Sequence, residues 1–154
     1  MGDEIAYFGA GCFWGVELEF SKVSGVLKTK VGYMGGNIKN PTYKDVCTDE
    51  TGHAEVVKVE FDPKKVSYKK MLDVFWKTHD PTQLNRQGLD VGTQYRSVIF
   101  YTNDEQKRIA SENLKEWQRK FSKKIMTSIE KAGKFYEAEE YHQKYLEKTG
   151  KNVC

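Results

Sequence analysis

The sequence predicts one domain of the α/β class (α/β or α+β) that extends over residues 1–154. The chain has the length of one ordinary domain, which is enough to bury a sizeable core. Runs with the two-residue period of strands alternate along it with patterns that have the period of helices. No repeat, linker or break in composition divides it, although the polar residues 149–154 are expected to form a mobile C-terminal tail.

The first third of the chain indicates a strand, a helix and a second strand, followed by turns. Residues 4–8, EIAYF, form a short apolar run that ends at Gly9 and is typical of a buried strand. A helical pattern covers residues 12–23, and the strand predicted over 25–36 is stopped by paired glycines. Residues 37–52 are rich in turn-forming residues.

The middle of the chain has the clearest patterns. Residues 53–63 alternate as a strand does, and one face of that strand carries Glu55, Val57, Val59 and Phe61. Ser67 can cap the helix that follows, because its hydroxyl can accept a backbone N–H of the first turn. The apolar residues of this helix recur at helical spacing: Tyr68, Met71, Leu72, Phe75 and Trp76.

The second half begins with a long polar loop at residues 80–94, which contains Gly88 and Gly92. A loop of this length inside a compact domain is usually functional. The later elements are expected to be a strand at 95–102, a helix from Asn103 or Asp104 to about Phe121, a strand at 125–130 and a short helix at 137–148.

Composition and charge exclude several classes of protein. Charged residues make up 31% and hydrophobic residues 38% of the chain, which is typical of a soluble globular protein. No apolar run approaches the ~20 residues of a membrane span, and the N-terminal MGDEIAYF lacks the pattern of a secretion signal. The net charge of +3 is too small to indicate nucleic acid. We therefore expect a cytoplasmic protein with no membrane and no nucleic-acid partner.

The three cysteines indicate either thiol chemistry or plain burial. Cys12, Cys47 and Cys154 form no C-x-x-C pair, and the three histidines are scattered. Because zinc sites usually bring two ligands within a few residues of each other, no metal site is expected. An odd number of cysteines in a reducing compartment also argues against a disulfide framework.

The stretch GAGCFWG places Cys12 where the first strand becomes the first helix. Its glycines do not have the spacing of a dinucleotide-binding loop, and no Lys-Ser or Lys-Thr of a P-loop follows them. At the first turn of a helix, free N–H groups and the helix dipole stabilise a thiolate, which is the nucleophilic form of cysteine. Alternatively, Cys12 is a small buried hydrophobe, and Phe13 and Trp14 belong to the core. Position alone leaves both interpretations open.

Glu55 favours chemistry over packing at Cys12. It lies on the same strand face as apolar residues, where a carboxyl loses hydration, so that its pKa rises and it can stay protonated near neutral pH. A protonated carboxyl can donate a proton. Alternatively, Glu55 bends out to solvent at the end of its strand. A thiolate, a neutral acid and aromatic rings together suit attack on an apolar, weakly electrophilic centre that carries a basic oxygen.

These residues resemble the methionine sulfoxide reductase A family, the peptide-methionine (S)-S-oxide reductases. GCFWG at 11–15 is similar to the active-site signature of that family. Three further segments resemble the family in its own order: PTYKDVCTDETGHAEVV at 41–57, THDPTQLNRQGLDVGTQYRS at 78–97 and FYEAEEYHQKYL at 135–146. The resemblance extends from about residue 5 to residue 148.

The resemblance implies a catalytic role for several matching residues. Cys12 would attack the sulfur of the sulfoxide, and Phe13 and Trp14 would hold the S-methyl group of the substrate. Glu55 would donate a proton to the sulfoxide oxygen, which is a very poor leaving group when it is unprotonated.

Three more roles follow from the same resemblance. The hydroxyls of Tyr43 and Tyr95 would point at the sulfoxide oxygen, and Asp90 would be linked to the site through hydrogen bonds or water. Judged from their sequence positions alone, Tyr43 could be an ordinary turn residue, Tyr95 could belong to the core, and Asp90 could form an Asx turn.

The fold that the resemblance implies is a two-layer α/β sandwich around a mixed β-sheet with a ferredoxin-like core. The implied reaction is the thiol-dependent reduction of the S epimer of methionine sulfoxide, free or in peptides and proteins, which leaves a sulfenic acid on Cys12. By the same resemblance, no cofactor and no metal are expected to take part. The expected partners are oxidised proteins or free methionine sulfoxide, and thioredoxin or another thiol reductant. The protein is expected to be a monomer.

Regeneration of Cys12 is where this sequence departs from the family. Many members resolve the sulfenic acid with a tail cysteine in a Gly-Tyr-Cys setting, whereas this tail reads TGKNVC. We hypothesise that Cys154 resolves Cys12. In the alternative, an external thiol such as thioredoxin or glutaredoxin reduces Cys12 directly. Cys47 is expected to be buried and inert, or otherwise a substitute resolving residue.

Two other functions are open from the residues alone. A cysteine-dependent acyl-transfer hydrolase would pair Cys12 with a histidine, for which His53 and His79 are available. An RNA-binding module would use the aromatic residues and the basic helix, although no aromatic-rich RNA-binding strand motif is present.

Overall fold

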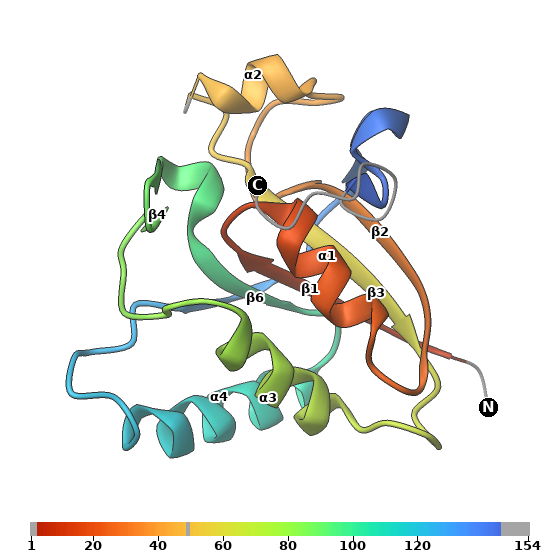
Figure 1. Cartoon of the computed structure of the whole chain (residues 1–154), viewed down its shortest axis with the longest axis vertical. Coiled ribbons are helices and arrows are strands. Elements are labelled where there is room, and N and C mark those ends of the chain that lie inside the picture. The colour runs from red at the N-terminus through yellow and green to blue at the C-terminus, as the bar shows by residue number, and fades with distance from the viewer. Residues whose placement is uncertain (1–2, 49, 146–154) are drawn as a thin grey trace.

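The computed structural model describes residues 3–48 and 50–145, which form a mixed β-sheet with helices packed on it (Figure 1). Within these residues the six-stranded sheet has the order β7-β6-β1-β3-β2-β8. Its strands are β1 Glu4–Ala10, β2 Val26–Met34, β3 Ala54–Phe61, β6 Ser97–Tyr101, β7 Ser128–Lys131 and β8 Tyr136–Glu137. Neighbouring strands are antiparallel except β6 and β7, which are parallel.

The described residues contain four α-helices. They are α1 Phe13–Ser21, α2 Tyr43–Cys47, α3 Tyr68–Thr78 and α4 Asp104–Gln118. In Figure 1, α1 crosses β1 and β3, while α3 and α4 lie side by side below them and α2 lies at the opposite end. This arrangement confirms the predicted α/β fold around a mixed sheet.

The helix predicted after Ser67 forms as its pattern indicates. The Ser67 hydroxyl accepts the N–H of Lys70 at 3.1 Å, and the predicted cap Asn103 likewise accepts the N–H of Gln106 at 2.8 Å. The five apolar residues of the predicted pattern are all buried in α3, and Val74 beside them is partly buried. Each large apolar side chain contributes about 1.5–3 kcal/mol by leaving water, so this face fixes α3 on the sheet.

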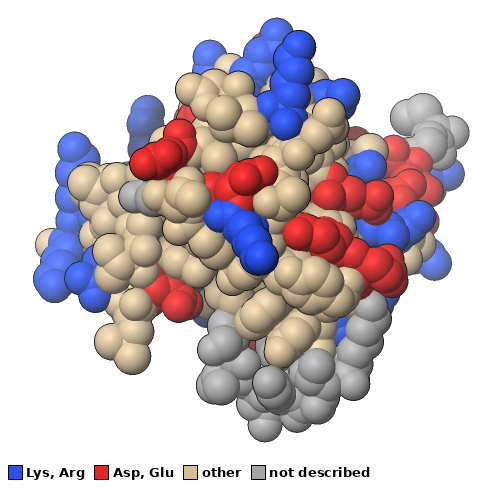
Figure 2. Space-filling model, turned by 90° about the horizontal axis from the view of Figure 1, so that it is seen from above, with Lys and Arg blue, Asp and Glu red and all other residues tan. Residues whose placement is uncertain are grey.

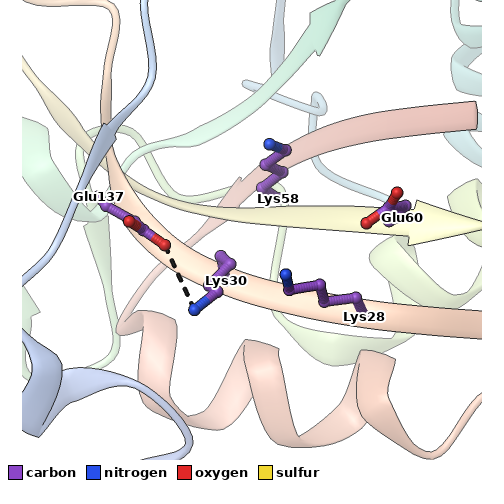
Figure 3. A pocket seen from close by; sticks show the side chains of 5 residues that line it. All are labelled: Lys28, Lys30, Lys58, Glu60 and Glu137. Atoms are coloured by element: carbon purple, nitrogen blue, oxygen red, sulfur yellow. Dashed lines mark ion pairs between the residues drawn. The ribbon is translucent and has the colours of Figure 1, made fainter.

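The alternation of β3 separates two environments. Val57, Val59 and Phe61 are fully buried under the helices, and on the other face Val56 packs in a smaller cluster that includes Phe100. Farther along β2 and β3, that second face is charged and solvated. Figure 3 shows the residues that line a small pocket of about 100 Å³ there: Lys28, Lys30, Lys58, Glu60 and Glu137. Lys30 and Glu137 form an ion pair at 3.4 Å.

Charges of both signs are scattered over the face that Figure 2 shows, as the small net charge leads one to expect. None of the helices in the described part of the chain has the length and hydropathy of a membrane span.

Two turn regions contain short elements that the sequence patterns did not predict. Thr42 caps α2, since its hydroxyl accepts the N–H of Asp45 at 3.2 Å while the Asp45 carboxylate accepts the N–H of Thr42 at 2.9 Å. In the loop 80–94, β4 (Arg86–Gln87) and β5 (Asp90–Val91) form a small hairpin, and residues Thr93–Tyr95 form a 3₁₀ turn. Elements this short show no hydrophobic period.

The short helix predicted at 137–148 does not form over residues 137–144, while Tyr145 is helical and 146–148 lie outside the described residues. Instead, β8 pairs with β2, and only Glu140–His142 form a 3₁₀ turn. The backbone N–H of Ala138 donates to the carbonyl of Val31 at 2.9 Å, and the Gln143 side chain bonds both the N–H and the carbonyl of Val31. These contacts with β2 hold the segment extended.

Candidate active site

Cys12 lies at the turn between β1 and α1, where it is the half-buried N-cap of the helix. Gly11 makes this turn with a φ of +93°, a conformation that residues with side chains rarely adopt. A Cβ on Gly9 would lie 2.7 Å from Val98 Cγ1 and 3.3 Å from the carbonyl oxygen of Glu55. Gly9 thus lets β1 pass close to its neighbours and brings Cys12 beside the start of β3.

The Glu55 carboxyl joins two elements in the interior, with only 1% of the residue exposed. Oε1 accepts the backbone N–H of Phe13 at 3.2 Å, and Oε2 accepts Nε2–H of Gln94 at 3.4 Å. Burial raises the pKa of Glu55 to about 8, an effect that these two hydrogen bonds oppose and the negative charge of Asp90 reinforces. The carboxyl is therefore mostly protonated at neutral pH and does not bend out to solvent.

Tyr43 and Tyr95 lie within electrostatic reach of Glu55, and their hydroxyls are hydrogen-bonded to each other. Tyr43 is the first residue of α2, and Tyr95 ends the 3₁₀ turn; both are half-buried. Burial and the charge of Glu55 raise the pKa of Tyr95 to about 12 and raise the pKa of Tyr43 further still. Both phenols therefore keep their protons and remain hydrogen-bond donors.

Aromatic rings surround the first turn of α1. Phe13 is buried and Trp14 half-buried. Trp14 Nε1–H donates to Nδ1 of His142 at 3.0 Å, and the ring centroids of Phe13 and His142 are 5.4 Å apart. Tyr145 stacks on Trp14 with a centroid distance of 3.9 Å. This set of rings offers an apolar, polarizable surface next to Cys12.

Asp90 reaches the site through the β4–β5 hairpin. The hairpin lies against the turn before Cys12, since a Cβ on Gly11 would be 3.0 Å from the Gln87 side chain. Asp90 pairs with Gln87, and its charge acts on both Glu55 and Tyr95. The structure therefore brings together all seven described residues that the sequence indicated: Cys12, Phe13, Trp14, Tyr43, Glu55, Asp90 and Tyr95.

Residues 4–154 match the protein family described as peptide methionine sulfoxide reductase. The chain belongs to this family. It is 63% identical over 153 residues to the peptide methionine sulfoxide reductase MsrA of Methanothermobacter thermautotrophicus. This match covers 98% of this chain and 90% of that protein. It is 59% identical over 150 residues to the chloroplastic peptide methionine sulfoxide reductase A4 of Arabidopsis thaliana, which covers 97% of this chain and 58% of that one.

Solved structures of the family have the same fold. Reduced Mxr1 from Saccharomyces cerevisiae superposes with a TM-score of 0.95 at 38% identity, over 99% of this chain and 89% of that one. Methionine sulfoxide reductase A of Corynebacterium diphtheriae gives 0.94 at 39% identity, over 99% and 78%. As a member of the family, this chain is an oxidoreductase that reduces methionine-S-sulfoxide through a catalytic cysteine.

Three residues at the site escaped the sequence reasoning. Gln94 bonds Glu55, and buried His142 bonds Trp14, while Nε2 of His142 has no hydrogen-bond partner within residues 3–48 and 50–145. Glu139 accepts the N–H of Tyr43 at 3.2 Å and the hydroxyl of Tyr33 at 3.3 Å. All three lie in segments that resemble the family, but no residue pattern distinguishes them from ordinary polar residues.

The structure corrects the expectation for one of the cysteines, Cys47. Cys47 is an exposed free thiol, so the expectation that it is buried is wrong. Cys47 is the last residue of the five-residue helix α2. Its sulfur accepts a hydrogen bond from Gln94 Nε2 at 3.6 Å, and its side chain is also hydrogen-bonded to the Tyr43 hydroxyl. The Cys12 sulfur is disulfide-bonded in this structure. Cys154 lies outside the described residues.

The two histidines weighed for a hydrolase are engaged elsewhere. Both ring nitrogens of His53 bond the backbone, at Gly36 and Ile38. His79 bonds the carbonyl of Phe75 and the hydroxyl of Ser97, and burial lowers its pKa to about 4. Residues 3–48 and 50–145 also contain no group of three His, Cys, Asp or Glu side chains arranged to hold a metal ion.

Proposed function

We propose that Cys12 is the nucleophile and Glu55 the proton donor in the reduction of the S epimer of methionine sulfoxide, free or in peptides and proteins. The observation that carries this assignment is the hydrogen bond from Phe13 N–H to the buried Glu55 carboxyl, directly after Cys12 in the chain. A nucleophile activated by a helix N-terminus and a neutral acid then meet at the same turn.

The proposed step is a nucleophilic attack by Cys12 that is coupled to proton transfer from Glu55. The Cys12 thiolate uses an electron pair to form a bond to the sulfoxide sulfur, and the Glu55 proton goes to the sulfoxide oxygen. The hydroxyl group then passes from the substrate sulfur to the Cys12 sulfur, so that a sulfur–oxygen bond forms on Cys12 while the sulfur–oxygen bond of the substrate and the new sulfur–sulfur bond both break. The electron pair of the sulfur–sulfur bond returns to the substrate sulfur, methionine leaves as the thioether, and Cys12 is left as a sulfenic acid. Cys12 is oxidised by two electrons, and the substrate is reduced by two.

The surrounding residues orient the substrate. We assign the Tyr43 and Tyr95 hydroxyls to the sulfoxide oxygen, because both are protonated donors next to Glu55. Phe13 and Trp14 hold the S-methyl group, and the charge of Asp90 adds to the rise that burial causes in the pKa of Glu55. Because oxygen and methyl group are held separately on a chiral sulfur, one epimer fits and the other does not.

We propose a second cysteine and thioredoxin for the return to the thiol. Condensation of the Cys12 sulfenic acid with the Cys154 thiol gives a disulfide and water, and thioredoxin then reduces the disulfide. The disulfide-bonded state of the Cys12 sulfur is compatible with such a cycle. Yeast Mxr1, crystallised in complex with Trx2, superposes with a TM-score of 0.68 at 28% identity. Direct reduction of Cys12 by an external thiol is the alternative.

We also propose that the chain is one catalytic domain and that it acts as a monomer in the cytoplasm; the tail expected at 149–154 lies outside the described residues. The thiol chemistry supports a reducing compartment.

The test is dithiothreitol-driven reduction of blocked methionine sulfoxide, with the S and R epimers assayed separately. Consumption of the S epimer alone, lost in Cys12→Ser and strongly reduced in Glu55→Gln, is the expected result. Full activity of Cys12→Ser would overturn the assignment of the nucleophile. Peptide mapping after one turnover without reductant tests the cycle, since the absence of a Cys12–Cys154 disulfide would exclude Cys154 as the resolving residue.

A further inference from the structure

We propose that Gln94 is a positioning residue for the sulfoxide reduction, which holds the Glu55 carboxyl in one orientation and ties it to the helix that carries Tyr43. The inference rests on the proposed role of Glu55 as the proton donor. Gln94 would act through Glu55 and not by contact with the reacting atoms.

The contacts of Gln94 are specific and buried. It lies in the 3₁₀ turn Thr93–Tyr95, directly before Tyr95, and only 3% of it is exposed. Its Nε2 donates to Glu55 Oε2 at 3.4 Å and to the Cys47 sulfur of α2 at 3.6 Å. An amide nitrogen carries two N–H groups, so one side chain can serve both partners. Gln94 thus connects β3 with α2.

The two N–H groups that donate to Glu55 determine which of its oxygens carries the proton. Oε1 accepts the Phe13 N–H at 3.2 Å, the shorter of the two contacts, and a carbonyl-type oxygen is the better acceptor. This geometry assigns the proton of the neutral acid to Oε2, the oxygen that Gln94 faces. With both oxygens held, the carboxyl cannot exchange them by rotating about its last torsion, so the acidic O–H keeps a fixed direction.

Gln94 also favours loss of that proton. A hydrogen bond donated to a carboxyl stabilises the charged form more than the neutral one, so Gln94 lowers the pKa that burial raises. The other titratable groups facing Glu55 are Tyr33 of β2, Tyr43 of α2, Asp90 of β5 and Tyr95. Cys12 precedes the residue of α1 whose N–H bonds Glu55. Among the groups that shift the pKa of Glu55, Gln94 is the side chain that opposes burial.

The first test is the pH dependence of a single turnover. Methionine released by reduced enzyme in the absence of added thiol is measured for wild type and Gln94→Met, which keeps the length and removes the amide. The matched control is Gln106→Met, because Gln106 is also buried and uses its amide on Ile5 and Thr102, away from Cys12. Both variants are expected to fold with somewhat lower stability.

Gln94→Met alone is expected to slow the single turnover at neutral pH, by about tenfold or more. Its alkaline limb, where Glu55 loses its proton, is expected to move up by about one pH unit, the size of one hydrogen bond to a charged group. Gln94→Glu, which places a second carboxyl beside Glu55, is expected to move the limb further. An unchanged alkaline limb in Gln94→Met, with a rate like that of Gln106→Met, would show that Gln94 is only structural.

A direct titration separates this inference from the proposed function. The carboxyl carbon of Glu55 is followed by NMR against pH in reduced wild type, Gln94→Met and Gln106→Met. A higher Glu55 pKa in Gln94→Met alone supports the positioning role, and an unchanged one overturns it. If that pKa moves while single-turnover rates do not, and Glu55→Gln is fully active, the proton-donor role of Glu55 has failed and the contact with Gln94 has not.

Discussion

The backbone N–H of Phe13 donates to Oε1 of Glu55 at 3.2 Å, across 42 positions of sequence. This bond joins the first turn of α1 to the start of strand β3, and it links the segment that carries Cys12 to the acid. An N–H at a helix start has no partner within its own helix. Here the neutral Glu55 carboxyl accepts the Phe13 N–H, so the contact that caps the N-terminus of α1 also orients the acid.

Replacement of Glu55 by Gln is expected to reduce the single-turnover rate by about 10²–10⁴-fold, because the amide keeps the shape but has no acidic proton to give. The effect should fall on the rate at saturating substrate more than on KM. Rapid-quench measurement of released methionine checks this. A Glu55→Gln enzyme within a factor of about three of wild type would remove the acid from the mechanism.

The pKa of Glu55 also predicts a pH dependence of stability. The folded-state pKa is about 8 against an ordinary pKa of 4.5, so the folded protein holds this proton over a range in which the unfolded chain has lost it. The stability that the neutral carboxyl contributes is therefore complete at low pH and is lost as pH rises through about 8.

Urea unfolding at about pH 5 and about pH 8.5 measures this loss, which should be of the order of a few kcal/mol. Glu55→Gln should remove a large part of it. If wild type and variant lose equal stability between the two pH values, Glu55 does not hold a proton in the folded protein.

Loss of the Trp14 ring should weaken substrate binding. Trp14 to Leu is expected to raise KM for methionine sulfoxide by about tenfold, since a large apolar contact to the S-methyl group disappears. Trp117 to Leu is the matched control, because Trp117 is also partly buried but bonds Asp73 on the helix layer. Steady-state kinetics with the S epimer distinguish the two. Equal KM values in both variants would contradict the assignment of Trp14.

When Cys12 is in its disulfide, an alkylating reagent is expected to modify Cys47, because the Cys47 thiol is free and exposed while the Cys12 sulfur is bonded. A maleimide on Cys47 lies against Tyr43 and Gln94, so after reduction the labelled enzyme should be slower than the unlabelled one. Cys47→Ser should keep its activity and resist the reagent. Peptide mapping locates the label, and a labelled enzyme with full activity would contradict the prediction.

A methyl group at Gly9 should disturb both fold and site. Gly9→Ala places a Cβ 2.7 Å from Val98 Cγ1, which cannot occur without movement of β1 or β6. A loss of about 1–3 kcal/mol in the free energy of unfolding is expected from such overpacking, with slower turnover because Cys12 shifts relative to Glu55. Gly133→Ala is the control, since its Cβ meets nothing within 4 Å. Equal stability of the two variants would count against the close approach.

The features that sequence alone predicted correctly are local. The period of Tyr68, Met71 and Leu72 with the cap at Ser67 defines α3, because side chains three and four apart share a helix face. The alternation of β3 puts Glu55 on a buried face, and the glycines around Cys12 mark a tight strand-to-helix turn. Each of these depends on residues within a few positions of one another.

Features that depend on distant segments needed the tertiary structure. The pattern at 137–148 is compatible with a helix, but bonds from Ala138 and Gln143 to Val31 on β2 keep residues 137–144 from forming it. Exposure of Cys47 depends on how α2 packs at the end of the sheet. Short turns such as Thr93–Tyr95 form through hydrogen bonds between nearby backbone groups, and they show no apolar period from which they could be predicted.

By itself, the sequence determined the α/β class, the position of Cys12 at a helix start and the place of Glu55 on an apolar strand face, since hydrophobic period and turn chemistry act over short spans. Only the tertiary structure decided that Gln94 bonds Glu55 and that His142 bonds Trp14 from 128 positions away. The protonation state of a buried acid and the arrangement of the aromatic rings depend on which distant groups come within hydrogen-bond distance. Only folding brings these groups together.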